Sequence, residues 1–377
     1  MLSLLFKFFV FVHAIYAYNT PPRQVSFAGT NLAGFDFGNK QDGSVVASEI
    51  VELTGPSHGT ALPVLEQMHH FISQGLNTFR LPVAWQYLVN YQLDGKLNAT
   101  GNFGVYDKLV KGCLDAGAAM CIIDVHNYAR WNGYIVGQSG SAADRPENRH
   151  LGSLWWQLAA WYKDEKRVAF DIMNEPHDLD VGMWAETVQW AVNSIRNATG
   201  SNEHIILVPG TDFCSAGSFT RMSSEALMKV KNSDGGTDNL ASTPQIFNLH
   251  KYLDHDASGT NFECTTNNID STFAPLAKWL RANNRRAMLT ETGGGPNAES
   301  CLKYLCEQND FINANADVYL GVVGWGAGGF DPAWVPRYNL TETPIQEGNE
   351  LCDQELVKKC IVGKFRGVTG SGSYVAP

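Results

Sequence analysis

Eight short apolar segments recur along the chain at intervals of roughly 30 to 50 residues, and each ends in polar or glycine-rich residues. Amphipathic stretches with helical spacing, such as Trp184 to Arg196 and Ala274 to Ala282, lie between them. Strands that alternate with helices predict an α/β fold, a (β/α)8 or TIM barrel, in which function gathers at the carboxyl ends of the strands. The predicted strands are Phe27 to Gly34, Asn77 to Val83, Met120 to His126, Val168 to Pro176, His204 to Gly210, Gln245 to Tyr252, Ala287 to Gly294 and Tyr319 to Gly328.

The length and composition fit a single domain. One barrel can fill most of the 377 residues, and no linker-like stretch interrupts the middle of the chain. Hydrophobic residues make up 44% of the chain and charged residues 18%, which is enough apolar material for a large core. The formal net charge of -10 would repel phosphate backbones, so nucleic acid is not an expected partner.

The amino-terminal segment predicts a cleaved secretory signal, residues 1–17. The apolar run from Met1 to Val12 is too short to span a bilayer comfortably, and it leads to small residues at Ala14 and Ala17. Lys7 inside this run leaves an uncleaved anchor as the alternative. Residues 18–377 would form the mature domain, with a short flexible tail at about 367–377. No later segment resembles a membrane span, so we expect a secreted, extracellular monomer.

Secretion would place the eight cysteines in an oxidising compartment, where disulfides are more common than metal sites. Cys113 and Cys121 flank one helix-to-strand turn. Cys301 and Cys306 stand about one helical turn apart and are poorly placed to bond each other, so they would reach different partners. Three Asn-X-Ser/Thr sequons also fit secretion from a eukaryotic cell. These glycosylation candidates are Asn98, Asn197 and Asn339.

Two of the predicted strands end with a glutamate. Glu175 follows the apolar run Val168 to Met173, and Glu291 follows Ala287 to Leu289. Two carboxyl groups at strand ends are the minimum apparatus for glycoside hydrolysis, because one protonates the departing sugar oxygen while the other attacks or stabilises the sugar cation. Either glutamate alone would more often be a salt-bridge partner or a helix cap.

Other polar and aromatic residues fall at the same predicted rim. Arg80 is predicted to end the second strand, and a guanidinium beside Glu291 would hold that carboxyl ionised, although an ordinary salt bridge is the simpler alternative. A lone histidine is usually a structural group. Trp325 lies between two glycines, where a sugar could lie against its ring, but a core position explains it equally well. The remaining candidates at the rim are His126, Asn127, His250 and Tyr252.

Five segments carry a specific resemblance to a known family. They are Phe79-Arg80-Leu81-Pro82, Asp124-Val125-His126-Asn127-Tyr128-Ala129-Arg130-Trp131, Met173-Asn174-Glu175-Pro176-His177-Asp178, His250-Lys251-Tyr252-Leu253-Asp254 and Leu289-Thr290-Glu291-Thr292-Gly293-Gly294-Gly295. In these segments the chain resembles glycoside hydrolase family 5, specifically the fungal-type secreted endo-β-1,4-glucanases, or cellulases. The likeness keeps the same order from about Phe27 to Cys360.

The resemblance implies a retaining mechanism with Glu175 as the acid/base and Glu291 as the nucleophile. The other roles that it implies are Asn174 at the sugar 2-hydroxyl, Arg80 and Tyr252 beside Glu291, His250 beside Glu175, His126 and Asn127 at the cleavage subsite, and Trp325 beneath the sugar. The fourth and seventh strands face each other across a barrel mouth, which suits the separation of about 5 Å that a retaining pair needs. The reaction requires no metal and no other cofactor.

The resemblance also implies three disulfides, Cys113 with Cys121, Cys264 with Cys301, and Cys306 with Cys360. Cys214 and Cys352 are left unmatched. They bond to each other, they stay free, or Cys352 competes with Cys360. Fungal members usually carry a tryptophan where this chain has Phe213 or Cys214, so sugar stacking near the fifth strand would differ. No cysteine-rich cellulose-binding module precedes the barrel, which favours soluble or amorphous glucan as substrate.

The expected activity is hydrolysis of internal β-1,4-glucosidic bonds in cellulose and related β-glucans, with retention of configuration. The same barrel could instead act on mannan, xyloglucan or mixed-linkage glucan, because the catalytic residues do not report the substituents at C2 or C6. A glycan-binding protein that has lost activity is a further alternative. The presence of both glutamates, together with all their supporting residues, argues against it.

Overall fold

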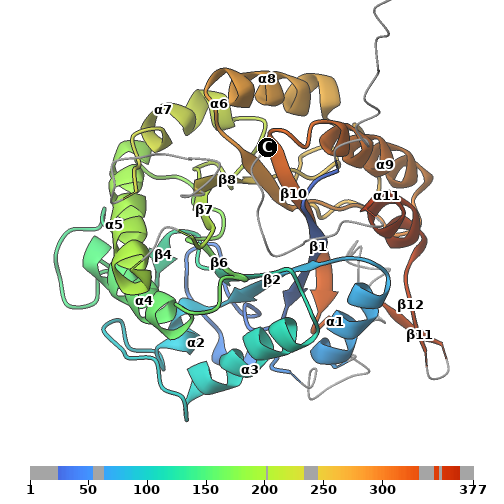
Figure 1. The fold of residues 1–377 in the computed structure, drawn as a ribbon. Helices are drawn as coiled ribbons and strands as arrows, with labels where there is room; N and C mark the ends of the chain where they lie inside the picture. Colours follow the sequence, from blue (N-terminus) through green and yellow to red (C-terminus); the bar gives the residue numbers. More distant parts are fainter. Residues whose placement is uncertain are drawn as a thin grey trace, which may run out of the picture.

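The computed structural model describes residues 24–53, 63–200, 203–232, 245–330, 344–347 and 350–365. The predicted signal, the predicted carboxyl-terminal tail and the sequon at Asn339 lie outside these residues. Eight strands form a closed barrel at the centre of the molecule, and the longer helices lie around it (Figure 1). This arrangement confirms the predicted (β/α)8 barrel.

Every neighbouring pair of barrel strands is parallel. Around the barrel the order is β1-β10-β9-β8-β7-β6-β3-β2, so each strand lies beside the barrel strand that precedes it in sequence and the last closes on the first. Each strand falls within one of the eight predicted segments. Their bounds are β1 (Phe27–Ala33), β2 (Thr78–Val83), β3 (Met120–Val125), β6 (Val168–Asp171), β7 (Ile206–Pro209), β8 (Gln245–His250), β9 (Ala287–Glu291) and β10 (Tyr319–Gly328).

The helices bury one face against the outside of the barrel, and local signals set their ends. In α5 (Val181–Thr199), the Asp180 side chain accepts a hydrogen bond from the backbone N–H of Met183, and Gly200 ends the helix with a φ of 63°. The other α-helices are α1 (Val64–Ser73), α2 (Trp85–Leu88), α3 (Asn102–Asp115), α4 (Asn148–Trp161), α6 (Phe219–Met222), α7 (Ser224–Leu227), α8 (Ala274–Ala282), α9 (Glu299–Ala314) and α11 (Gly363–Phe365).

Short elements complete the description. Two small antiparallel sheets lie outside the barrel, β4 (Arg130–Trp131) with β5 (Tyr134–Ile135) and β11 (Ile345–Glu347) with β12 (Glu350–Cys352). The tighter or wider helical turns are η1 (Ala47–Glu49), η2 (Ile269–Phe273) and η3 (Val357–Val362). Among the residues that the structure describes, no helix combines the length and the apolar character needed to cross a membrane.

The inner face of the barrel changes from apolar to polar along the strands. Because residues two apart share one face of a strand, Ile122 and Asp124 point the same way on β3, as do Met288 and Thr290 on β9. The apolar layer comprises Met120, Ile122, Ala169, Leu207, Ile246, Met288, Leu320 and Val323. The polar layer above it comprises Asn31, Arg80, Asp124, Asp171, Asn248 and Thr290, all fully buried. The apolar layer is therefore a packed floor beneath a polar site.

The three disulfides in the described residues are the pairs that the family resemblance implies. Cys113 on α3 bonds to Cys121 on β3. The other two disulfides both reach α9, and they join Cys264 with Cys301 and Cys306 with Cys360. Cys214 and Cys352 are free, so they neither bond to each other nor displace Cys360.

Candidate active site

Arg80 is the electrostatic centre of the polar layer. It is the third residue of β2, inside the barrel, and not at the strand end as the sequence predicts. Its guanidinium contacts Asp171 Oδ2 at 2.8 Å, Glu291 Oε1 at 2.6 Å, Asn174 Oδ1 at 2.9 Å, Asn31 Oδ1 at 3.0 Å and Asp124 Oδ2 at 3.0 Å. Burial alone would lower the pKa of Arg80, but the surrounding carboxylates raise it well above its usual value. The side chain is thus a permanent buried cation.

Glu291 is the last residue of β9 and receives a hydrogen bond on each carboxyl oxygen. Arg80 donates to Oε1, and the Tyr252 hydroxyl donates to Oε2 at 3.0 Å. Both oxygens therefore act as acceptors, one of them from a cation, which is the arrangement that a nucleophilic carboxylate needs. Burial raises the pKa of Tyr252 well above its usual value, so its hydroxyl keeps the proton that it donates.

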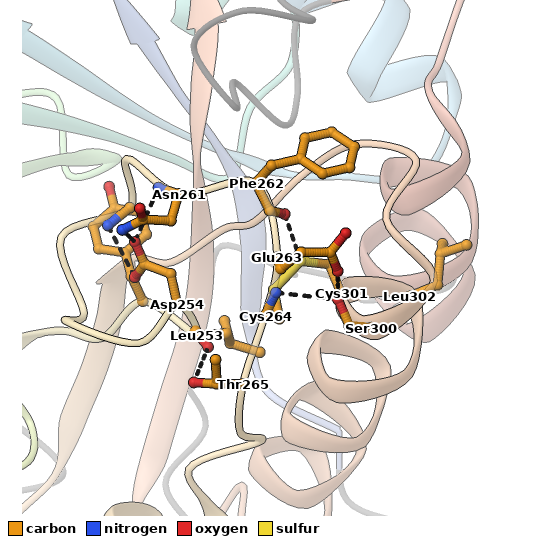
Figure 2. Close-up of a disulfide and its surroundings, with 12 residues drawn as sticks. Leu253, Asp254, Asn261, Phe262, Glu263, Cys264, Thr265, Ser300, Cys301 and Leu302 are labelled. Atoms are coloured by element: carbon orange, nitrogen blue, oxygen red, sulfur yellow. Dashed lines mark hydrogen bonds between the residues drawn. A yellow bond between two sulfur atoms is a disulfide. The ribbon is translucent and has the colours of Figure 1, made fainter.

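Two of the glycines after Glu291, Gly294 and Gly295, are required by the Cys264–Cys301 disulfide and its loop. A Cβ atom on Gly294 would lie 2.5 Å from the sulfur of Cys264 and 2.6 Å from that of Cys301. Figure 2 shows this disulfide joining the loop that contains Phe262 to the start of α9. A Cβ on Gly295 would meet the backbone oxygen of Phe262 at 2.3 Å. The disulfide and its loop thus pack directly against the segment that leaves the Glu291 strand.

Glu175 is held differently. It lies four residues beyond the end of β6 with a φ of 41°, so the prediction that it ends the strand is wrong. Left-handed backbone of this kind costs an ordinary residue about 1–3 kcal/mol, so the surrounding structure must hold it in place. Burial in the barrel mouth raises the pKa of Glu175 to about 7, although the positive groups of His126 and Arg80 oppose the rise. The side chain keeps 18% of its surface open to solvent.

His250 links the two glutamates. It is the last residue of β8, and its Nδ1 lies 2.8 Å from Glu175 Oε1 and 3.4 Å from Glu291 Oε2. Burial lowers the pKa of His250 to about 4, so the ring is neutral near pH 7. One ligand atom from each of the three residues can be chosen so that all lie within 4.8 Å of one another.

Asn174 connects Arg80 to His126. Its Oδ1 accepts from Arg80, which fixes the amide, and its Nδ2 then lies 3.1 Å from His126 Nε2. On the other side of the ring, Nδ1 lies 2.7 Å from Asp124 Oδ2. Burial opposes protonation of His126, but Asp124 outweighs it and raises the pKa to about 9. A second ring proton would meet the Asn174 amide hydrogens, so this hydrogen bond works against protonation.

Trp325 reaches the site through a bulge in β10. The pairing of β10 with β1 shifts register between Thr30 and Leu32, opposite this residue, and Gly326 has a φ of 112°. The indole stacks on His126, with ring centroids 5.6 Å apart and planes at 18°. The flanking glycines suggest from the sequence that no side chain crowds the ring, but the structure shows otherwise. His126 covers one face of it.

Asn127 hydrogen-bonds residues outside this group. It is fully buried, its Oδ1 accepts from the backbone N–H of Trp85 at 2.7 Å, and its Nδ2 donates to Gln86 at 2.6 Å. These contacts give Asn127 a structural part in holding α2 and provide no support for a direct sugar contact. The other predicted site residues come together around Glu175 and Glu291.

Sequence reasoning missed the polar residues beneath the site. Asn248 donates to Asp171 at 2.7 Å and accepts from Thr290, and Asn31 donates to the backbone oxygens of Thr290 and Gly324. The available signal was a polar residue at an inward position of an otherwise apolar strand, which is costly unless it is hydrogen-bonded. The residues with this signal are Asn31, Asp124, Asp171 and Asn248.

Comparisons with known proteins agree with this geometry. A profile of the Cellulase family, glycosyl hydrolase family 5, matches residues 41–329. The chain belongs to glycosyl hydrolase family 5. It is 52% identical over 346 residues to Endoglucanase EG-II of Hypocrea jecorina, which covers 90% of this chain and 78% of that protein.

One solved structure and one further curated protein are also similar over most of their length. The crystal structure of Cel5A (EG2) from Hypocrea jecorina (Trichoderma reesei) matches with a TM-score of 0.81 and 49% identity, over 90% of this chain and 98% of that one. The manganese dependent endoglucanase Eg5A of Phanerodontia chrysosporium is 40% identical over 336 residues, covering 88% of this chain and 79% of that protein. The closed barrel is thus the fold of a family 5 glycoside hydrolase.

In this family 5 chain, Glu175, His250 and Glu291 are the residues that could hold a metal ion, among those that the structure describes. Their ligand atoms are already engaged with one another and with Tyr252. The Arg80 guanidinium lies 2.6 Å from Glu291 and would repel a second cation. A metal at this position would therefore have to compete with the Arg80 guanidinium for Glu291.

Proposed function

We propose that this chain is a secreted endo-β-1,4-glucanase that cleaves internal bonds of cellulose and related β-glucans with retention of configuration. The observation that carries the proposal is the pairing of Glu175 and Glu291, with carboxyl oxygens within 4.8 Å. Retaining glycosidases hold their two carboxyl groups about 5–5.5 Å apart, whereas inverting enzymes leave room for a water between them. Family membership and the endoglucanase names of the relatives support the same activity.

In the first step, Glu291 attacks the sugar carbon and Glu175 protonates the departing oxygen. Glu291 is suited to attack because Arg80 and Tyr252 fix both carboxyl oxygens. Glu175 is suited to protonation because its pKa is raised to about 7, so a large fraction of the carboxyl holds its proton at neutral pH. The glycosyl–oxygen bond breaks, and a glycosyl ester forms on Glu291.

In the second step, Glu175 acts as a base and takes a proton from the water that attacks the glycosyl ester. The released Glu291 carboxylate returns to Arg80 and Tyr252. Neutral His250 contacts both glutamates through Nδ1, so it can keep Glu175 in place as that carboxyl loses and regains its proton. Two inversions at the same carbon give net retention.

We assign Asn174, His126 and Trp325 to the sugar at the cleavage point. Arg80 and His126 hold the Asn174 amide in one orientation, which suits a contact with the 2-hydroxyl. The Trp325 face that His126 does not cover would lie against the flat apolar face of a glucose ring. Asn127 is not included, because Trp85 and Gln86 engage both polar atoms of its amide.

The substrate is tested by product analysis on four polymers in parallel, namely carboxymethyl cellulose, mannan, xyloglucan and barley glucan. The proposal expects the highest kcat/KM on cellulose derivatives or barley glucan and a rapid fall in viscosity from internal cleavage. Preference for mannan or xyloglucan would keep the mechanism but replace the substrate. Binding without hydrolysis of all four would favour the non-catalytic alternative.

Secretion rests on the three disulfides and on exposed sequons. The side chains of Asn98 and Asn197 are exposed, as glycan attachment requires, and Asn197 lies on α5. We propose that the protein acts outside the cell as a glycosylated monomer and that its hydrolysis needs no metal ion. Peptide mapping of secreted protein without reduction would detect the disulfides and the occupied sequons together.

A further inference from the structure

A row of aromatic rings runs through the site from Trp325 to the loop after β7. The Trp325 stack on His126 is followed by Tyr128, whose ring meets that of His126 edge-on, with centroids 5.7 Å apart and planes at 77°. Tyr128 also meets His177 edge-on, with centroids 6.1 Å apart and planes at 69°. His177 in turn stacks on Phe213, with centroids 4.4 Å apart. Tyr128 is thus the middle ring of the row.

The row leads from the cleavage point toward the loop that carries the acid. Trp325 and His126 belong to the sugar at the cleavage point in the proposed function, and His177 lies two residues after Glu175. Tyr128 contacts both His126 and His177. The departing oxygen must reach Glu175, so the sugar that carries it away lies on the Glu175 side of the cleavage point. The position of Tyr128 therefore suits a contact with the sugar that leaves.

Left-handed backbone fixes the direction in which the Tyr128 ring points. Tyr128 has a φ of 52° and Ala129 a φ of 59°, although neither is glycine, so surrounding contacts must hold them in place. Arg130 supplies two of these contacts, because its Nη1 donates to the Tyr128 oxygen and its Nη2 to the His177 oxygen, both at 2.8 Å. One guanidinium thus joins the Tyr128 backbone to the loop that follows Glu175.

The Tyr128 hydroxyl has no hydrogen-bond partner among the residues that the structure describes, and the side chain is partly exposed. In other tyrosines of the barrel the hydroxyl is engaged, since Tyr106 donates to the Leu81 oxygen and Tyr319 to the Phe273 oxygen, both at 2.7 Å. Burial, reinforced by neighbouring carboxylates, raises the pKa of Tyr128 well above its usual value, so its hydroxyl keeps the proton. The hydroxyl is therefore a donor that a bound sugar could use.

We propose that Tyr128 is a substrate-binding residue whose hydroxyl donates a hydrogen bond to the sugar on the leaving side of the cleaved bond. This inference rests on the retaining activity in the proposed function. The same position receives an acceptor in the second step when a sugar hydroxyl replaces water. The acceptor oxygen then bonds to the sugar carbon, its proton passes to Glu175, and the ester bond to Glu291 breaks. Tyr128 should therefore favour transfer to a sugar over transfer to water.

The test measures how the glycosyl ester divides between a sugar acceptor and water. The substrate is 2,4-dinitrophenyl β-cellobioside, whose leaving group departs without protonation, and cellobiose is added as the acceptor. Tyr128→Phe keeps the ring contacts and removes only the hydroxyl. The loss of one hydrogen bond should lower the ratio of cellotetraose formed to dinitrophenolate released by about 3-fold to 10-fold. Both products come through the same glycosyl ester, so this ratio does not depend on how much of the protein is folded.

Hydrolysis of cellotetraose gives a second measurement on Tyr128→Phe. Its kcat/KM should fall by the same factor as the transfer ratio, because the leaving sugar of cellotetraose would occupy this position. On the aryl glycoside without acceptor, kcat/KM should stay within about twofold of the parent enzyme, because no sugar lies there. Equal losses on the two substrates would place Tyr128 on the other side of the bond and overturn the inference.

Tyr304→Phe is the matched control, because Tyr304 is a partly exposed tyrosine on α9, outside the barrel. This variant should keep both the transfer ratio and the kcat/KM values of the parent enzyme. If the parent enzyme is active and Tyr128→Phe has an unchanged transfer ratio, the hydroxyl makes no such contact and only this inference fails. If the parent enzyme hydrolyses neither substrate, the proposed function itself fails, which is a separate result.

Discussion

The two glutamates occupy regions of the barrel mouth that are built in opposite ways. Glu291 ends a regular strand, and a buried guanidinium and a tyrosine hydroxyl hold its two oxygens. Glu175 stands beyond its strand on left-handed backbone, and burial raises its pKa to about 7. Glu291 is thus paired with a cation, whereas Glu175 lies in a partly desolvated pocket. Environment, not residue type, separates the nucleophile from the acid.

Replacing Glu291 should have the largest effect on activity. Glu291→Ala should reduce kcat on every substrate by about 10,000-fold or more, because the glycosyl ester cannot form. Added azide would occupy the vacated space and attack from that face, so any azide product should have the inverted α-configuration. Steady-state assays and NMR of the product check both statements. Retained hydrolysis would end the two-carboxylate mechanism.

Breaking the Glu175 region should have a smaller and substrate-dependent effect. Glu175→Ala should lower kcat/KM by about 100-fold to 10,000-fold on cello-oligosaccharides. Aryl glycosides with good leaving groups should still form the glycosyl ester with little loss. Azide should then replace the water of the second step and give a product of retained β-configuration. An α-product here, with a β-product from Glu291→Ala, would show that the two roles are exchanged.

The cation beneath Glu291 should be essential to folding as well as to attack. Arg80→Met would leave Asp171 and Asp124 buried without their cation, and breaking a buried ion pair from one side costs about 3–5 kcal/mol. Arg281→Met is the control, because its pair with Asp317 is exposed and should be worth at most about 1 kcal/mol. Urea unfolding of both variants gives the comparison. Similar stabilities would show that the polar layer does not depend on Arg80.

The sequence predicted the barrel well because its signals are local. The apolar strand segments and the amphipathic helices each repeat at their own spacing, and all eight strands lie within the predicted ranges. The same signals could not place residues along a strand. Arg80 was expected at a strand end but lies inside the barrel, and Glu175 lies beyond its strand. Strand ends depend on hydrogen bonds to neighbouring strands, which are formed between residues distant in sequence.

The sequence predicted most of the residues that lie around the two glutamates. It missed the buried polar residues beneath them. His250 and Tyr252 contact the glutamates beside which the family resemblance places them, whereas the implied contact of Asn174 with the sugar 2-hydroxyl stays a prediction. The implied sugar contact of Asn127 has no support in the structure, because Gln86 and the backbone of Trp85 engage both polar atoms of its amide. Such contacts are set by tertiary packing and leave no spacing pattern in the chain. A buried polar residue in an apolar strand was the signal available for the deeper layer.

The pH dependence of kcat/KM tests the role of Glu175 as the acid. Glu175 must carry its proton to act as the acid, and its pKa is raised to about 7. We therefore expect kcat/KM on cello-oligosaccharides to fall about tenfold per pH unit above pH 7. In Glu175→Ala, assayed with 2,4-dinitrophenyl β-cellobioside, this basic limb should be absent. A basic limb near the usual glutamate pKa, or one that survives in Glu175→Ala, would assign the limb to another group.

Metal removal should have the smallest effect. It tests whether a bound cation connects the Glu175 and Glu291 regions. A divalent cation held by Glu175, His250 and Glu291 would bridge the two glutamates and lower the pKa of Glu175. The Arg80 guanidinium beside Glu291 opposes such binding. Treatment with EDTA should therefore leave kcat/KM unchanged, and added Mn²⁺ should not move the basic limb of the pH profile. Loss of activity with EDTA that Mn²⁺ restores, together with a limb that moves to lower pH, would mean that a bound cation, and not burial alone, sets the pKa of Glu175.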